Sequence, residues 1–469
     1  MQERLGSRIV KKGLIAQSDL KTALERQRLY GGRIGYNLIA LGLIDEADLQ
    51  ELFTFKPARV HQVKDTGIDG EFIADLVLKH CLYIKKFKIA HLTEKTRLAS
   101  SVIANLLDDL RRDGLIEIVR GNTALNIFEY EYRITDSGIN RSLRNLEECR
   151  YVGPAPVSLE AYKQAVDIQT VKSIEILEQG LKQTFSSLVV SDEKIKIYGA
   201  AINSVKPIFL YGPSGNGKTT IAEYIGQSLP GQVYVPYAVL VENQVIVLYD
   251  QVNHRLVDGD AADDQADQRW VKIRRPVVFA GGELTLKTLD LDFNPHAKFY
   301  DAPLQMKANN GLFILDDFGR QMVDPQTLLN RWIVPLDRQT DYLTLHTGIK
   351  FEIPFDQLVI FATNLPPEKI ADDAFLRRLR YKIKVDYPTV EAFLDIFQNV
   401  CTSNKINFNQ DAFDHLVDKY KRSKRKFACC HPRDLIDQII DYAHFTRKAP
   451  RITKASIDRA WEYYFESTV

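Results

Sequence analysis

A glycine-rich loop between an apolar run and a helical pattern is the first feature that indicates chemistry. Residues 212–220 read GPSGNGKTT and fit the spacing G-x-x-x-x-G-K-[ST]. The apolar residues 207–211 precede this loop and the helical pattern IAEYIGQSL follows it, in the order strand, loop, helix. Glycines here let backbone N–H groups surround phosphates at a helix N-terminus, where the helix dipole favours anions. The predicted nucleotide-binding residues are Gly212, Pro213, Ser214, Gly215, Asn216, Gly217, Lys218, Thr219 and Thr220.

Two carboxylates at the end of a later apolar run extend this chemistry. Residues 311–319 read GLFILDDFG, which predicts a buried strand that ends at Asp316 and Asp317. We expect Lys218 to reach the β- and γ-phosphates and Thr219 to ligate Mg²⁺. A strand beside the glycine-rich loop would bring Asp316 to the same Mg²⁺ through water, and Asp317 would orient the attacking water. The predicted metal ligands are therefore Thr219 and Asp316.

Three further motifs follow toward the C-terminus. They are FATN at residues 361–364, DDAFLRRLRYKIKVDYP at residues 372–388 and HPRDL at residues 431–435. With the two motifs above, their order resembles that of the AAA+ ATPases over about residues 190–465. The resemblance implies a P-loop core that binds and hydrolyses ATP with Mg²⁺, followed by a helical lid.

The resemblance also implies a role for four polar side chains. Asn364 would contact the water or the γ-phosphate as sensor 1, and Arg433 would reach the γ-phosphate from the lid as sensor 2. Arg377, with Arg378, would enter a neighbouring subunit's site as an arginine finger. Because such an arginine acts in trans, the resemblance implies a homo-oligomeric ring, with a hexamer as the expected size. The predicted catalytic residues are Asp317, Asn364, Arg377, Arg378 and Arg433.

Two features depart from the common AAA+ pattern. The family usually has Asp-Glu in the second motif, and Asp317 is one methylene shorter than Glu, so we expect ATP binding with slow hydrolysis. The segment between Lys218 and Asp316 contains several strand-like pieces, which predicts a β-rich insertion. It is similar to the AAA+ branch with an inserted hairpin before an ANNG-type segment, here residues 308–311. No unfoldase-type pore loop or GAFTGA loop is present, so the remodelled protein is unidentified.

An internal repeat opens the sequence. Residues 4–27 read RLGSRIVKKGLIAQSDLKTALERQ, and residues 33–56 read RIGYNLIALGLIDEADLQELFTFK. The repeat resembles the MshEN domain of secretion and pilus-assembly ATPases, which implies binding of cyclic di-GMP. The second copy departs from that motif, notably where Lys56 replaces the closing Gln, so a helical docking module without a ligand is the alternative. The residues implied in cyclic di-GMP binding are Arg4, Leu5, Gly6, Gln27, Arg33, Ile34 and Gly35.

The segment after the repeat predicts a winged helix. Helical patterns are followed by an alternating stretch at residues 116–134 that indicates a β-hairpin. DNA binding would place the helix near residues 98–112 in the major groove, but that helix also carries acidic side chains, and a spacer or protein-docking role is the alternative. A basic run, KRSKRK at residues 421–426, is either a solvated loop or a contact for a subunit or nucleic acid.

Composition limits the class of protein. The chain of 469 residues is too long for one core, and its 62 Lys and Arg nearly balance 61 Asp and Glu, which argues against a histone-like protein. No apolar run approaches the ~20 residues of a membrane span and the N-terminus lacks a secretory signal, so we expect a cytoplasmic protein without a membrane span. The five scattered cysteines are expected to be reduced thiols.

The predicted fold class is multidomain α/β: a P-loop AAA+ core with a parallel sheet and a β-rich insertion, a C-terminal helical lid, a small N-terminal helical MshEN-like domain and a winged-helix middle domain. The expected segments are the MshEN-like domain at residues 1–58, the winged helix at 68–150, a linker at 151–170, the AAA+ core at 171–387 and the lid at 388–469.

The main hypothesis is a cyclic di-GMP-responsive AAA+ ATPase that works as a ring to remodel an unidentified protein. One alternative is a DNA-binding winged-helix regulator whose core is a nucleotide-gated oligomerisation switch. Another is a structural scaffold that uses ATP only to assemble.

Overall fold

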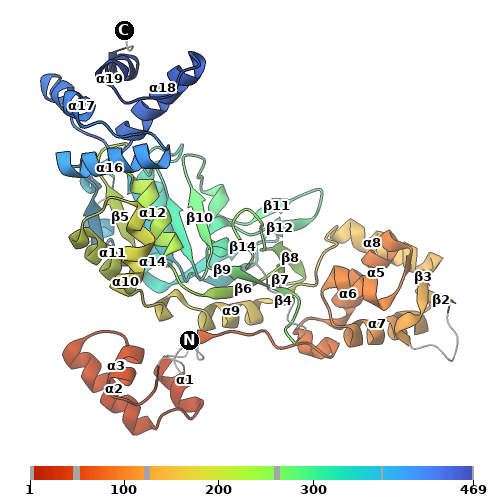
Figure 1. The fold of residues 1–469 in the computed structure, drawn as a ribbon. Helices are drawn as coiled ribbons and strands as arrows, with labels where there is room; N and C mark the ends of the chain where they lie inside the picture. Colours follow the sequence, from red (N-terminus) through yellow and green to blue (C-terminus); the bar gives the residue numbers. More distant parts are fainter. Residues whose placement is uncertain (1–4, 46–52, 121–126, 258–264, 371–372, 467–469) are drawn as a thin grey trace.

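The computed structural model describes residues 5–45, 53–120, 127–257, 265–370 and 373–466. A central sheet lies in the middle of the molecule, with a helical lid above it in the view of Figure 1. The helices from α5 (starting at Gly70) to α8 (ending at Glu148) project to one side, and those from α1 (starting at Leu5) to α3 (ending at Ala40) form a separate group below the sheet. Within the described residues, no helix is long and apolar enough to cross a membrane.

The central sheet has five parallel strands in the order β10-β13-β16-β5-β17. Almost every residue of its inner strands is buried, as expected when helices cover both faces of a parallel sheet. The sequence prediction of a mixed α/β core with a parallel sheet is therefore confirmed. The strands are β10 (Val277–Ala280), β13 (Leu312–Leu315), β16 (Leu358–Thr363), β5 (Ile208–Tyr211) and β17 (Tyr381–Lys384).

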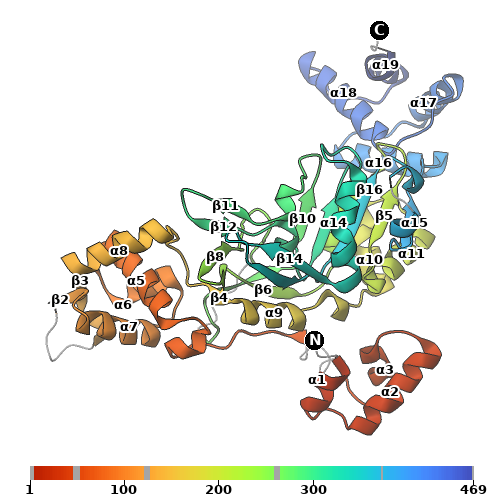
Figure 2. The ribbon, with the colours of Figure 1, turned by 180° about the vertical axis from the view of Figure 1, so that it is seen from behind.

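Helices cover the two faces of this sheet through alternate residues of each strand. On one face, Ile208 and Leu210 of β5 join a core with helices α11 (Asp192–Ser204) and α12 (Lys218–Gln227). On the other face, Phe209 joins a core with helix α14 (Pro325–Arg338). Figure 2 shows α14 on the face that is turned away in Figure 1. The continuous apolar strands thus create a three-layer core whose carboxyl-terminal strand ends meet at one edge.

The lid consists of amphipathic helices around an aromatic core that includes Phe393, Phe397 and Phe413. Thr389 caps the first lid helix by accepting a hydrogen bond from the Ala392 N–H at 3.2 Å. The expected C-terminal helical region is confirmed. Its helices are α16 (Val390–Ser403), α17 (Gln410–Arg422), α18 (His431–Phe445) and α19 (Lys454–Trp461), followed by a π-helical turn (Glu462–Glu466).

The region between α12 and β13 is rich in strands. One antiparallel pair joins β6 (Gln232–Pro236) to β9 (Trp270–Arg274), and a second sheet has the order β11-β12-β8-β7-β4. The members of the second sheet are β11 (Asp292–Asn294), β12 (Phe299–Asp301), β8 (Gln244–Val247), β7 (Ala238–Val241) and β4 (Val157–Ser158).

Residues 151–170, which the prolines led us to expect as a linker, instead contribute structure to this insertion. Strand β4 pairs in parallel with β7, with Val157 opposite Val239. Helix α9 (Leu159–Ile168) follows, and its Tyr162 is buried in the core of the insertion. Pro154 and Pro156 restrict the backbone only up to the point where β4 begins, so they do not prevent pairing.

The segment before this has the order helix, strand, helix, helix, strand, strand, helix, with the strands in the order β1-β3-β2. Its apolar core continues into the insertion, because Ala238 and Val245 belong to the same buried cluster. Its elements are α5 (Gly70–Ile84), β1 (Lys86–Phe87), α6 (Ile89–Thr96), α7 (Ser100–Arg112), β2 (Ile116–Arg120), β3 (Glu131–Ile134) and α8 (Asp136–Glu148).

The N-terminal repeat forms the helices α1 (Leu5–Lys11), α2 (Gln17–Tyr30) and α3 (Ile34–Ala40). A Cβ atom on Gly6 would lie 2.5 Å from Leu20 Cδ1, so this glycine lets α1 approach α2 closely. The remaining elements are α10 (Glu178–Thr184), α13 (Leu304–Lys307), α15 (Asp373–Leu376), the hairpin β14 (Thr340–Thr344) and β15 (Lys350–Pro354), and short 3-10 turns.

Candidate functional site: a P-loop under a helical lid

The glycine-rich loop connects the end of β5 to the start of α12, at the carboxyl edge of the central sheet. Gly215 and Gly217 have φ values of +78° and +81°, in the left-handed region that favours glycine. A Cβ atom on Gly212 would lie 2.1 Å from the Val385 carbonyl oxygen, so a side chain has no room there. The glycines therefore allow a tight loop that leads directly into the N-terminus of α12.

Lys218 is folded over this loop. Its Nζ donates hydrogen bonds to the carbonyl oxygens of Gly212 and Pro213, both at 2.9 Å, and to Asn364 Oδ1 at 2.6 Å. Only 7% of the residue is exposed. Burial lowers the pKa of Lys218, while the charges of Asp316 and Asp317 oppose this shift. The positive charge of Lys218 thus lies inside the loop. It is near the polar residues that follow β16 and β13, which are Asn364 and the pair Asp316 and Asp317.

The two aspartates are joined to neighbours of the lysine by hydrogen bonds. Asp316 Oδ2 accepts a hydrogen bond from Thr219 Oγ1 at 2.7 Å, and Asp317 Oδ1 accepts one from Asn364 Nδ2 at 3.3 Å. Asp317 has a φ of +46°. Asp occupies this left-handed region more readily than most residues, which gives a backbone reason for Asp where the resembling family has Glu.

The structure therefore brings together five of the predicted side chains. Because β13, β16 and β5 are adjacent and parallel, the residues that follow them meet at one edge. The donor set of a hydroxyl and a carboxylate suits Mg²⁺, which takes one or two protein oxygens beside phosphates. The five side chains belong to Lys218, Thr219, Asp316, Asp317 and Asn364.

The start of lid helix α18 rests on the P-loop, which the sequence motifs did not indicate. The Cys430 N–H donates to the Gly215 carbonyl oxygen at 2.9 Å, and the Cys429 N–H donates to Asn216 Oδ1 at 3.2 Å. A Cβ atom on Gly215 would lie 2.6 Å from Cys430 Sγ. The paired cysteines carried no motif of their own in the sequence, whereas here their backbone holds the lid against the nucleotide loop.

Arg433 lies in the first turn of α18, just after this contact. Its side chain is 71% exposed, and its nearest acidic partner among the described residues is Asp434 at 4.0 Å. Arg433 therefore lies at the end of α18 that faces the P-loop, and among the described residues no hydrogen bond joins it to Lys218 or Asp316.

The two arginine-finger candidates differ in their surroundings. Arg378 forms an ion pair with Asp337 on α14, with Nη2 and Oδ2 2.9 Å apart. Arg377 is exposed. Of these two arginines, Arg377 is therefore the one whose guanidinium projects from the surface of the core.

The residues expected to bind cyclic di-GMP do not form one set. Arg4 lies outside the described residues, Gly6 is packed between helices, and Gln27 Nε2 donates to the Gly32 carbonyl oxygen at 2.7 Å. Gly35 is buried in α3 and Ile34 is partly buried, while Leu5 begins α1. Arg33 donates to the carbonyl oxygens of Ile174 and Asn203, so it joins the N-terminal helices to the core.

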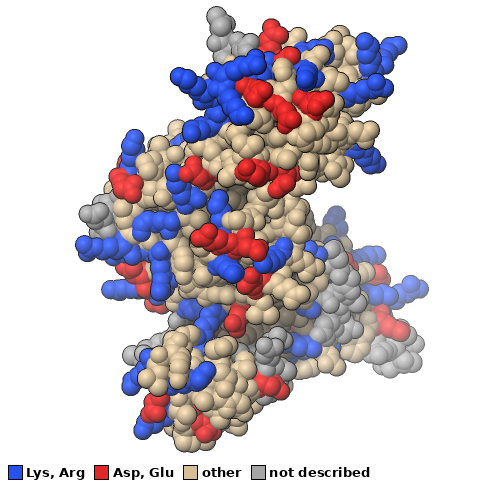
Figure 3. All heavy atoms as spheres, turned by 60° about the vertical axis from the view of Figure 1, so that its left-hand side comes forward, with Lys and Arg blue, Asp and Glu red and all other residues tan. Residues whose placement is uncertain are grey.

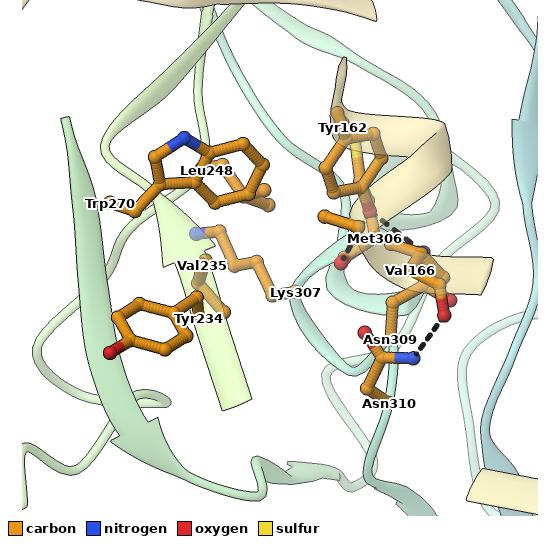
Figure 4. A pocket seen from close by; sticks show the side chains of 11 residues that line it. Tyr162, Val166, Tyr234, Val235, Leu248, Trp270, Met306, Lys307, Asn309 and Asn310 are labelled. Atoms are coloured by element: carbon orange, nitrogen blue, oxygen red, sulfur yellow. Dashed lines mark hydrogen bonds between the residues drawn. The ribbon is translucent and has the colours of Figure 1, made fainter. Parts of the chain in front are cut away.

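The ANNG-type segment lies at the opposite, amino-terminal edge of the sheet. Asn309 Nδ2 donates to the Tyr162 hydroxyl at 2.8 Å, and Asn310 Nδ2 donates to Asp356 Oδ2 at 2.9 Å. Figure 4 shows both asparagines beside a cavity of about 10 Å³, close to the space of one water. Burial lowers the pKa of the nearby Arg275 to about 10, and this side chain donates to the Asn310 carbonyl oxygen at 2.7 Å. The hydrogen bonds of these residues join α9 to the starts of the neighbouring strands.

Comparison with known proteins gives one family match and distant fold similarities. Residues 389–463, which cover the lid, match the family described as "Domain of unknown function (DUF8689)". A search of curated proteins finds no match. Among solved structures, the chain is similar to a point variant of RuvB from Thermotoga maritima, with 13% identity and a TM-score of 0.33 over 61% of this chain and 70% of that chain.

Two other solved structures give similar values. NtrX from Brucella abortus has 13% identity and a TM-score of 0.36, covering 59% of this chain and 57% of that chain. Domain III of the Thermotoga maritima replication initiation protein DnaA has 14% identity and a TM-score of 0.34, covering 61% of this chain and 98% of that chain. These similarities are too distant to assign a function, and none of these comparisons supports the MshEN resemblance. What the described residues show is a mixed α/β fold, with a five-stranded parallel sheet and a C-terminal helical region.

Proposed function

We propose that the protein binds and hydrolyses ATP with Mg²⁺ as an AAA+ ATPase. The observation that carries the proposal is the contact set Lys218–Asn364–Asp317 beside Thr219–Asp316 at the end of a P-loop. Lys218 now meets uncharged oxygens, and the phosphate oxygens of a nucleotide offer it stronger, charge-assisted hydrogen bonds.

Each side chain of the set has a distinct task in this proposal. Thr219 and Asp316 would hold Mg²⁺, which neutralises phosphate charge when bound. Lys218 would bind the β- and γ-phosphates, and Asn364 would keep Asp317 in place to orient the attacking water. Because the Asp317 side chain is short, the water lies farther from the carboxylate than it would from Glu, and slow turnover is expected.

The test measures nucleotide affinity with a fluorescent ATP analogue and phosphate release with ATP. Lys218→Ala should lose at least tenfold in affinity, whereas Asp317→Asn should bind the analogue and lose phosphate release. Lys206→Ala is the matched control, because Lys206 is an exposed lysine just before β5, at the opposite edge of the sheet. Equal affinity of wild type and Lys218→Ala would refute the site, and phosphate release that persists in Asp317→Asn would refute the role of the aspartate.

We further propose that the active form is a homo-oligomeric ring in which Arg377 acts on the neighbouring subunit. The exposure of Arg377, with Arg378 held by Asp337, supports Arg377 as the arginine that acts in trans. Mixing inactive Lys218→Ala and Arg377→Ala subunits should restore part of the phosphate release, since some mixed interfaces combine an intact P-loop with an intact arginine. No recovery in mixed rings would refute an arginine that acts in trans.

The proposal for the N-terminal helices is a cyclic di-GMP sensor that regulates this ATPase. Its support is the repeated Arg-apolar-Gly pattern, and in the structure Arg33 of the second copy is bound to the core. A ligand that takes up Arg33 must therefore compete with docking of these helices. Calorimetric titration of cyclic di-GMP into wild type, Arg4→Ala and Arg33→Ala, with phosphate release measured on each, tests this. The absence of heat with wild type would leave the helices as a docking module.

The alternative hypothesis, in which α7 binds the major groove of DNA, has less support than the ATPase. Arg111 and Arg112 of this helix both form ion pairs with Asp108, the first at 2.9 Å, so their charges are compensated on the same helix.

A further inference from the structure

The densest basic run of the chain covers the last two residues of α17 and the start of the loop that leads to α18. Residues 421–426, which we call the lid loop, read KRSKRK, and all six are exposed. Among the described residues, Lys421 has an acidic neighbour in Asp418 at 3.7 Å, whereas no ion pair engages Arg422, Lys424 or Lys426. These three cations are therefore exposed and form no ion pair within the described part of the chain. Figure 3 shows Lys and Arg side chains gathered over the lid, at the top of that view.

Contacts with the rest of the lid hold the lid loop in one conformation. A basic run that is merely solvated does not need such contacts. The Arg425 guanidinium lies 3.9 Å from the centre of the Phe465 ring and 5.4 Å from that of Trp461. The Arg425 N–H donates to the Tyr420 carbonyl oxygen at 2.9 Å, and Lys424 adopts a left-handed φ of +51°. Arg425 thus anchors the loop while its neighbours project outward.

The same short segment connects this loop to the nucleotide site. Two residues after Lys426, the chain reaches Ala428, whose Cβ lies 3.7 Å from the Cβ position of Gly215. The next two residues donate their N–H groups to the P-loop at 3.2 and 2.9 Å, as described above. Any ligand that holds the lid loop therefore acts on residues that touch the P-loop.

The chemistry of the lid loop favours one class of partner. A stable protein interface needs apolar or aromatic anchors at its centre, and none of the six side chains is apolar. Phosphate groups, by contrast, are bound by Lys and Arg alone, without sequence-specific contacts. We propose that the lid loop binds the phosphate backbone of a nucleic acid, and that this binding is coupled to nucleotide binding at the P-loop.

The binding test uses the full-length protein and labelled DNA of about 30 nucleotides, single-stranded and as a duplex, with fluorescence anisotropy between about 50 and 200 mM salt. The variant is Arg422→Gln/Lys424→Gln/Lys426→Gln, which leaves the Arg425 anchor intact. The matched control is Arg447→Gln/Lys448→Gln/Arg451→Gln, which removes the same charge from an exposed loop between α18 and α19. Because both variants change only exposed side chains, their unfolding midpoints should equal that of wild type.

We expect the lid-loop variant to bind at least one of the two DNA forms tenfold more weakly, and the control to stay within twofold of wild type. The slope of log affinity against log salt should fall by about 2 to 3, since each lost phosphate contact removes about 0.7 to 0.9. Equal losses in both variants would overturn the assignment to this loop. Absence of wild-type binding at the lowest salt, or binding of poly-glutamate as tight as DNA, would overturn nucleic acid as the ligand.

Coupling is tested by the affinity for a fluorescent ATP analogue with and without saturating DNA. We expect a change of at least threefold, and by thermodynamic reciprocity the analogue must change DNA affinity by the same factor. The change should disappear in the lid-loop variant and persist in the control. Equal analogue affinities with and without DNA would overturn the coupling. Lys218→Ala should still bind DNA, so failure of the ATP site and failure of the lid loop give different results.

Discussion

Replacing Gly215 by alanine tests whether the lid rests on the P-loop. The new side chain would have to adopt a left-handed φ of +78°, which costs an L-residue about 1–2 kcal/mol. Its Cβ would also lie 2.6 Å from Cys430 Sγ, and overpacking of this kind costs about 1–3 kcal/mol. We therefore expect Gly215→Ala to lower the free energy of unfolding by about 2–5 kcal/mol and to weaken ATP analogue binding.

A double-mutant cycle with Cys430→Ala separates the two costs. Removal of the Sγ atom should abolish the clash but leave the backbone cost, so the double variant should recover about 1–3 kcal/mol relative to the sum of the single variants. Denaturant unfolding can be followed by tryptophan fluorescence, because Trp461 lies in the buried core of the lid. Additivity of the two single changes within about 0.5 kcal/mol would refute the contact between Cys430 and the P-loop.

Three further predictions follow from other parts of the core. Asp356→Ala removes the buried acceptor of three donors, which are the Thr170 hydroxyl, the Val171 N–H and the Asn310 amide. Denaturant titrations should therefore show a free energy of unfolding that is about 3–5 kcal/mol lower than in wild type. The control, Asp337→Ala, changes an exposed aspartate and should lower it by less than about 1 kcal/mol. Burial lowers the pKa of His254 below its ordinary 6.5. The stability that the neutral ring contributes is therefore complete above pH 6.5 and is lost as the pH falls toward the pKa of the folded state. In His254→Gln, the free energy of unfolding should depend less on pH in this range. Arg377→Ala should lower the rate of phosphate release and leave the free energy of unfolding unchanged. Arg378→Ala should lower the free energy of unfolding by less than about 1 kcal/mol, because it loses the ion pair with Asp337. The reverse pattern would exchange the roles of the two arginines.

The sequence was enough to predict features that depend on contiguous residues. The P-loop is contiguous, and the apolar runs before Asp316 and Asn364 mark buried strands that end in polar groups. A strand beside the P-loop brings Asp316 toward Lys218, whereas a place for Asn364 in the same site was implied by the AAA+ resemblance.

Contacts between distant segments were not visible in the same way. The prolines before Val157 indicated a linker, yet the strand that follows them completes the second sheet, because β7 offers a parallel edge. Arg33 was interpreted through its repeat motif, yet its guanidinium meets carbonyl oxygens from residues 174 and 203. Backbone carbonyl acceptors leave no signal in the side-chain sequence, so neither partner could be inferred from a pattern.

The two edges of the central sheet have opposite physical characters, and this difference bears on how the protein could be regulated. At the amino edge, Asp356 and Arg275 lie in a dense network of buried hydrogen bonds, whose disruption is costly. At the carboxyl edge, the lid touches the P-loop through two hydrogen bonds from backbone N–H groups at the start of α18. Since a few hydrogen bonds are easily exchanged while a buried network is not, motion coupled to nucleotide binding is expected at the lid contact and not at the sheet. A ligand on the lid loop would therefore act on the two hydrogen bonds between the lid and the P-loop, which are the most easily broken contacts described here for the site.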